Sequence, residues 1–192
     1  MGSRWRGFGA FVVCAALGVT DASAGSSALE RGEIDLVMSE VKGSGVPRAT
    51  VKGLVDASVE DVWAVVSDCR RSGKLFEGVY AIKRHSHSGG SSVCSSKFSM
   101  PFPFSDLKSK MKYRTEVTAS NRRVSWRLVA GDFTRSTGSW VVTPYEGSST
   151  RTLVEYTSHA EPNIPVPGWL QEQGLRDTIP SGVRNLRKVL GR

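Results

Sequence analysis

The sequence has few of the residues and motifs that usually carry catalytic chemistry. Among its 192 residues there are three histidines, His85, His87 and His159. No G-x-S-x-G elbow, phosphate-binding glycine loop or H-E-x-x-H motif occurs. His85 and His87 lie beside a Gly/Ser turn, and a third metal ligand is not evident at a usable spacing. The sequence therefore predicts no catalytic residue, no metal site and no cofactor.

Long apolar runs are also scarce. One covers residues 8–19 and follows Arg4 and Arg6, but it is shorter than the roughly 20 residues that cross a bilayer as a helix. The small residues Ala22 and Ala24 come next, in the order typical of a secretory signal peptide over residues 1–24. The alternative is a buried N-terminal helix of the domain. We expect a cleaved signal, no permanent anchor, and a protein exported to the periplasm or outside the cell.

Cysteine is too rare to form a disulfide scaffold. Beyond the predicted signal peptide only Cys69 and Cys94 remain, and an oxidising compartment would permit them to pair. A disulfide would require their Cα atoms to lie within about 7 Å of each other. The rest of the chain has the length of one domain, predicted over residues 28–192, which must be stabilised by its hydrophobic core.

Most of this domain shows the period-two alternation of strands with one wet face and one apolar face. A short amphipathic helix is expected at residues 59–67, with Ser58 as its N-cap. Asp56, Glu60, Asp61 and Asp68 flank it and are expected to form a solvated face. A hairpin turn is predicted at residues 87–90. The predicted strands cover residues 32–41, 48–55, 78–85, 92–100, 108–117, 123–129, 136–143 and 151–158.

The C-terminal segment changes to the 3.6-residue period of a helix. Its apolar stripe consists of Leu175, Ile179, Val183, Leu186 and Leu190. Pro180 interrupts the stripe, and a proline inside a helix costs about 3 kcal/mol unless the helix bends. We therefore predict a long, bent terminal helix. Strands followed by a terminal helix give an α+β fold.

Five stretches of the chain occur in a characteristic order: SVEDVWAVVSD (58–68), MPFPFSD (100–106), SWRL (125–128), GD (131–132) and GSW (138–140). Taken in this order they resemble the START-like or SRPBCC superfamily, and the resemblance covers about residues 46–192. It is strongest to the branch described as polyketide cyclase/dehydrase-like or coenzyme-Q-binding. What the resemblance implies is a helix-grip fold, in which a curved antiparallel sheet wraps around a long C-terminal helix with a short helix near the N-terminus.

The resemblance also implies a deep apolar cavity between sheet and helix, where members hold lipids, quinones, polyketides or steroids. Each inward residue could equally be ordinary core, and no polar specificity group can be assigned. The candidate ligand-binding residues are Phe98, Met100, Met111, Tyr113, Trp126, Trp140, Leu175, Ile179 and Val183.

The chain carries a formal net charge of +8, and four of its basic residues form one row, Lys108, Lys110, Lys112 and Arg114. Because the row alternates with apolar residues, a wet sheet face explains it, and no nucleic-acid partner is expected. A transient contact with an anionic membrane surface is the functional alternative.

The leading hypothesis is non-catalytic binding, and transfer, of a hydrophobic small molecule. One rival is a polyketide cyclase or dehydratase with an acid/base pair deep in the same pocket. The other is an envelope surface-binding protein that uses the basic strand face. The ligand and the oligomeric state are not indicated by the sequence.

Overall fold

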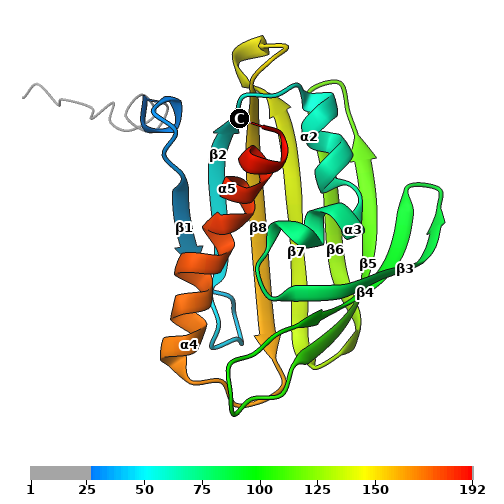
Figure 1. The fold of residues 1–192 in the computed structure, drawn as a ribbon, viewed down its shortest axis with the longest axis vertical. Coiled ribbons are helices and arrows are strands. Elements are labelled where there is room, and N and C mark those ends of the chain that lie inside the picture. The colour runs from blue at the N-terminus through cyan, green and yellow to red at the C-terminus, as the bar shows by residue number, and fades with distance from the viewer. Residues whose placement is uncertain (1–26, 192) are drawn as a thin grey trace, which may run out of the picture.

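The computed structural model describes residues 27–191, and the predicted signal peptide and cleavage site lie outside this range. Its main feature is one curved sheet of eight strands in the order β1-β2-β8-β7-β6-β5-β4-β3, with every neighbouring pair antiparallel. The C-terminal helix crosses the concave face of this sheet (Figure 1). The α+β helix-grip architecture expected from the sequence is therefore confirmed.

The strands agree with the predicted ones to within a few residues at each end. Their bounds are β1 Asp35–Ser39, β2 Arg48–Val55, β3 Val79–Ser88, β4 Ser91–Phe98, β5 Leu107–Val117, β6 Arg122–Gly131, β7 Phe133–Pro144 and β8 Thr152–Pro162. The predicted hairpin turn at 87–90 is too long. His87 and Ser88 still pair with β4, and the turn consists of Gly89 and Gly90, whose φ angles of 54° and 73° suit glycine.

Short helices cover part of the concave face. They are α2 (Val59–Val66), α3 (Cys69–Ser72) and the 3₁₀ turn η1 (Gly73–Leu75), and a further 3₁₀ turn, η2 (Tyr145–Gly147), joins β7 to β8. Of these, α2 lies over β7, and α3 and η1 lie beside β3. The predicted N-cap is present, because Ser58 Oγ accepts a hydrogen bond of 3.1 Å from the Asp61 amide. Val62, Val65 and Val66 are the buried face of α2.

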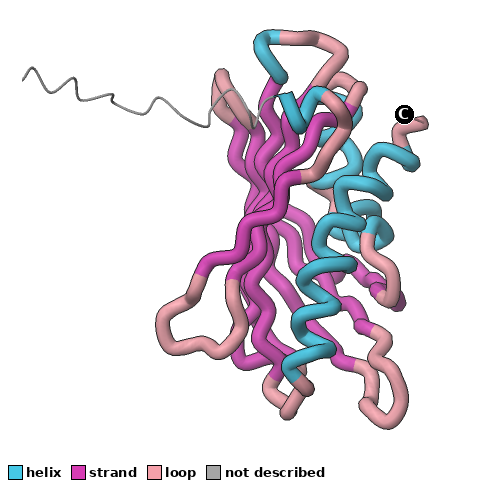
Figure 2. The backbone as a smooth tube through the Cα atoms, turned by 90° about the vertical axis from the view of Figure 1, so that its left-hand side faces the viewer, coloured by secondary structure: helices cyan, strands magenta, loops and turns pink. Residues whose placement is uncertain are grey.

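The terminal helix runs through α4 (Gly168–Gln173), a π-helical segment η3 (Gly174–Thr178) and α5 (Ile179–Val189). The wider π turn immediately precedes Pro180. Proline has no amide hydrogen and its ring collides with the carbonyl four residues earlier, so a local widening accommodates it without ending the helix. Figure 2 shows the helix continuing along the sheet through this segment.

The hydrophobic core lies where α2 and α5 cover the sheet. Val51, Val55, Val142 and Val154 from three strands meet Val183 and Leu186 from α5 there, all fully buried. α5 can approach β2 closely because residue 53 is glycine: a Cβ on Gly53 would lie only 2.8 Å from Val183 Cγ1.

The opposite, convex face of β5 is wet, as the alternation predicts. The side chains of Lys108, Lys110, Lys112 and Arg114 are exposed, while Leu107, Ser109 and Met111, which alternate with them, are buried. The acidic residues around α2 form ion pairs: Asp56 with Arg151 at 2.8 Å, and Glu60 with Arg122. Within residues 27–191 no helix is both long enough and apolar enough to cross a bilayer.

Candidate functional site

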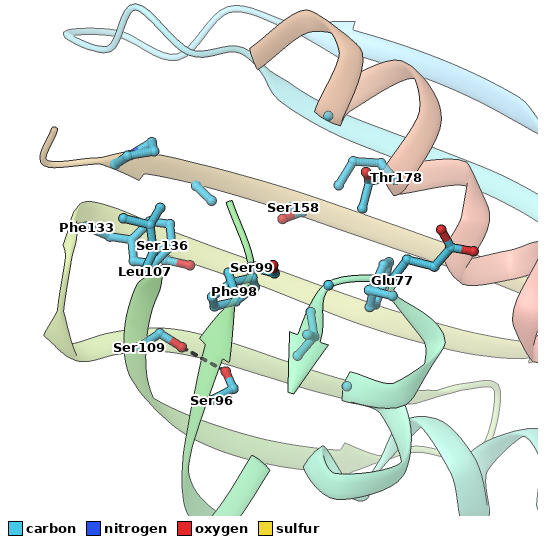
Figure 3. Close-up of a pocket in the computed structure, with 18 of the residues that line it drawn as sticks. Glu77, Ser96, Phe98, Ser99, Leu107, Ser109, Phe133, Ser136, Ser158 and Thr178 are labelled. Atoms are coloured by element: carbon cyan, nitrogen blue, oxygen red, sulfur yellow. Dashed lines mark hydrogen bonds between the residues drawn. The ribbon is translucent and has the colours of Figure 1, made fainter. Parts of the chain in front are cut away.

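A cavity of about 570 Å³ opens between the concave face of the sheet and the terminal helix. It is lined from β3 to β8 on the sheet side, from α4, η3 and the start of α5 on the helix side, and from the segment around η1. Figure 3 looks into this space. The volume falls within the range of small-molecule sites, about 300 to 1,000 Å³.

One wall of the cavity is a chain of aromatic rings that extends across the sheet. The ring centroids of Tyr113 and Trp126 lie 6.0 Å apart, those of Trp126 and Tyr156 5.7 Å apart, and those of Tyr156 and Trp140 4.5 Å apart. Gly138 makes room for this arrangement, because a Cβ at that position would lie 2.3 Å from Trp126 Cζ2. The wall is therefore apolar, rigid and able to contact a flat or aliphatic ligand.

Eight of the nine predicted ligand-binding residues line this cavity. They are Phe98, Met100, Met111, Tyr113, Trp126, Trp140, Leu175 and Ile179. The prediction for Val183 is wrong: this residue is fully buried against β2 and does not reach the cavity. The helix stripe turns from the cavity into the solid core between Ile179 and Val183, and the period of the stripe alone cannot show where this happens.

Sequence reasoning missed several large residues of the lining. Phe76 lies in the irregular segment after η1, where no period marks it, and its ring lies 5.0 Å from that of Tyr156. Phe133 begins β7 and packs edge-on against Phe98 at 5.6 Å. Leu170 of α4 precedes the part of the helix stripe that the pattern identified. Phe133 lies just before the predicted strand at 136–143, so only a longer strand prediction would have included it.

The polar part of the lining consists mainly of serine hydroxyls. Ser96 and Ser109 hydrogen-bond to each other at 3.0 Å, and Ser136 and Ser158 belong to β7 and β8 (Figure 3). Burial raises the pKa of the Tyr113 phenol to about 12 and raises the pKa of Tyr156 further still, although a hydrogen bond from Ser158 opposes the latter shift. Both phenols are therefore protonated at neutral pH.

The mouth of the cavity is marked by the exposed members of its lining. These are Glu77, Gly78, Ser99, Pro101, Gln173 and Asp177. Two large apolar side chains are exposed beside it: Phe102 follows Pro101 in the β4–β5 loop and is 97% exposed, and Trp169 precedes Leu170 in α4 and is 65% exposed.

A disulfide joins Cys69 at the start of α3 to Cys94 in β4, with the Cα atoms 6.6 Å apart. Both cysteines also line the cavity. The bond therefore ties the short helices to the strand that carries Ser96 and Phe98, on the side of the cavity opposite α5.

The lining offers apolar surface and neutral hydroxyls, with carboxylates only at the rim. Glu77 and Asp177 are both exposed there. In the part of the chain that the structure describes, no group of three or more histidine, cysteine or acidic side chains comes together to hold a metal ion. The arrangement can enclose an apolar molecule and hydrogen-bond to it.

Residues 55–187 match the family model described as polyketide cyclase / dehydrase and lipid transport. A comparison with curated proteins gave no match. Among solved structures, a STAR-related lipid transfer protein from Xanthomonas axonopodis aligns with a TM-score of 0.71 and 20% identity, over 83% of this chain and 94% of that one.

Two further structures show the same fold. Human StAR-related lipid transfer protein 5 has a TM-score of 0.71 and 14% identity, over 83% of this chain and 82% of its own. A START superfamily protein from Mycobacterium smegmatis has a TM-score of 0.53 and 18% identity, over 75% and 97%. At these identities the likeness establishes the fold, and the bound molecule has to be argued from the cavity itself.

Proposed function

Because the chain belongs to the polyketide cyclase / dehydrase and lipid transport family of the START-like superfamily, we propose that it binds one hydrophobic small molecule in its cavity and transfers it between surfaces. The observation that carries this proposal is the cavity of about 570 Å³ with its aromatic wall. Protein interiors are otherwise packed with few voids larger than a water molecule, so an apolar space of this size indicates a ligand.

The ligand would enter and leave between the β4–β5 loop and α4. Phe102 and Trp169 extend from these two segments into solvent beside the mouth. Aromatic side chains favour the boundary between water and hydrocarbon, and they would let the mouth rest on a bilayer while an apolar ligand passes without crossing water. Phe102→Ala and Trp169→Ala should slow transfer between vesicles and leave the affinity for a soluble ligand analogue unchanged.

Electrostatics would favour an anionic membrane as the surface. The exposed row of Lys108, Lys110 and Lys112 has no acidic partner within the described residues. Attraction of this kind is screened by salt. Transfer from vesicles rich in anionic lipid should therefore fall as the salt concentration rises, whereas transfer from neutral vesicles should not.

Transfer would take place in the periplasm or outside the cell. The N-terminal residues have the order of a cleaved signal peptide, and the Cys69–Cys94 disulfide is of the kind that oxidising compartments maintain. N-terminal sequencing of the exported protein should give Gly25 as its first residue. A retained Met1 would contradict export.

The cyclase or dehydratase alternative would require titratable groups that converge on a bound substrate. The carboxylates of the lining, Glu77 and Asp177, lie at the exposed rim, and its phenols are protonated at neutral pH. This distribution favours binding over acid/base catalysis. The surface-binding alternative would suit a sheet over a filled core, whereas here the sheet encloses a cavity.

Native mass spectrometry of the protein purified from its own host tests the proposal. The expected result is a mass excess of one small apolar molecule, released by organic extraction and identified from the extract. The control is Ile179→Trp, which places a larger side chain in the lining and should lower the bound fraction. A wild-type protein that is always empty, and that takes up no lipid from host membranes, would contradict the proposal.

A further inference from the structure

The lining of the cavity contains no positively charged side chain, although the protein is strongly basic. The net charge is +8, yet among the described residues that line the cavity there is no lysine, arginine or histidine. The charged members are Glu77 and Asp177, both at the exposed rim. An anionic head group would therefore meet either an interior without cations or a rim with two carboxylates.

Hydroxyl groups are what the interior offers to a polar ligand. Ser136 is only 5% exposed, and in the described part of the chain neither its hydroxyl nor that of Tyr113 has a hydrogen-bond partner. Both oxygens are reachable by a small molecule, because the one fully buried side-chain N or O atom without a hydrogen-bond partner among residues 27–191 belongs to Arg187. Both hydroxyls border the cavity and can bond to a guest.

We propose that the cavity selects uncharged ligands that carry a hydroxyl or carbonyl oxygen, and that Ser136 and Tyr113 bind this oxygen. This inference rests on the proposed function and specifies its substrate class. The same chemistry is found in fatty alcohols and sterols, in acylglycerols and esters, and in quinones. It excludes free fatty acids in their ionised form and lipids whose phosphate would have to enter the cavity.

The physical reason is the cost of desolvating a charge. Moving an ionised carboxylate out of water without a cation partner costs far more free energy than moving an alcohol or an ester. One or two hydrogen bonds in the cavity are enough to replace the water that an alcohol or ester loses. A cavity lined with hydroxyl groups can therefore compensate an alcohol or ester for its lost hydration, but not an ionised carboxylate. A fatty acid could still enter in its protonated form, so its apparent affinity should rise as the pH falls towards the pKa of its carboxyl group.

Titration with ligands of equal chain length tests the selection. Decanol, methyl decanoate and decanoate share nearly the same apolar surface, so differences in affinity report the head group. Trp126 and Trp140 line the cavity, and their fluorescence follows occupancy. At pH 8 both neutral ligands should bind at least tenfold more tightly than decanoate. Decanoate binding as tightly as decanol would overturn the inference and leave the proposed function intact. If none of the three binds, the proposed function itself fails.

A matched pair of variants tests the role of the hydroxyls. Ser136→Ala combined with Tyr113→Phe should weaken decanol binding about two- to tenfold, the effect of a hydrogen bond or two, and should leave the affinity for undecane unchanged. The control is Ser139→Ala, in the same strand, whose hydroxyl accepts from Arg123 on the other face of the sheet. Equal affinity of both variants for decanol would overturn the assignment of these two hydroxyls.

Discussion

The two halves of the terminal helix are built for different tasks. In α5, Val183 and Leu186 are fully buried against the sheet, whereas α4 and η3 contain no buried residue although Leu170 and Leu175 face the sheet across the cavity. One continuous helix thus closes a solid core with one half and a hollow with the other. Apolar residues at helical spacing therefore show which face turns inward, but not whether that face meets protein or space for a ligand.

The largest loss of stability should come from a change in α5, the half of the helix that covers the solid core. Leu186→Ala removes a side chain that is 0% exposed, and truncation of a packed leucine costs about 2 to 5 kcal/mol because a void remains. Urea unfolding should show this loss in the free energy of unfolding. The matched variant is Leu175→Ala in the hollow half, which should lose only about 1 kcal/mol, since its side chain already borders open space. Equal losses would show that the two halves do not differ.

The disulfide should have the next largest effect. Replacing Cys69 and Cys94 by serine removes a cross-link over a sequence separation of 25, and such links contribute about 2 to 4 kcal/mol by restricting the unfolded chain. The double variant should unfold at lower urea concentration than the oxidised protein. Reduction of the wild type should give the same shift. A reduced wild type as stable as the oxidised one would show that this side of the cavity does not depend on the bond.

Changes in the two halves of the helix should affect ligand affinity in the opposite order to stability: the hollow half should matter more. Ile179→Ala alters the cavity wall at the point where the hollow half ends, and it should weaken ligand affinity several-fold with a loss of stability of about 1 kcal/mol or less. Leu186→Ala should leave affinity unchanged under conditions where it is folded. Thermal unfolding and tryptophan quenching by a ubiquinone analogue, measured on both variants, check this. Unchanged affinity together with an equal loss of stability in Ile179→Ala would mean that this helix only packs.

The smallest effect concerns His159, on the outer face beneath the β1–β2 loop. Its Nε2 lies 3.1 Å from Ser44 Oγ, which donates a hydrogen bond to Glu161, and burial lowers the pKa of the imidazole below 6.5. As the pH falls below 6.5, the unfolded chain takes up a proton that the folded state resists, so stability is present above 6.5 and is lost on acidification. His159→Gln should reduce this loss between pH 7.5 and 5.5, measured by urea unfolding. If His159→Gln loses as much stability on acidification as the wild type, the loss comes from other titratable groups.

The sequence predicted the strands and the exposed basic row closely, because strict alternation reports which face of a strand is wet. The same alternation placed Met111 and Tyr113 on the inward face of β5, and the resemblance to the START-like superfamily implied that this face borders a cavity. The prediction that Val183 lines the cavity was wrong, because the helical period of the apolar residues does not show how deeply each one is buried. Phe76 was missed because its segment has no period at all. Ser109 shares the inward face of Met111, and a serine among inward apolar residues was the available signal for the polar part of the lining.

The most direct test of the central claim is to locate the ligand in the hollow half. Brominated stearyl alcohol quenches tryptophans that it touches. Trp126 lies in the cavity wall, and Trp63 lies on α2 beside the solid core. Trp140 also lines the cavity, so the account predicts that Trp126→Phe combined with Trp140→Phe removes most of the saturable quenching and that Trp63→Phe leaves it. Quenching that survives the double variant but disappears with Trp63→Phe would place the ligand outside the cavity and contradict the account.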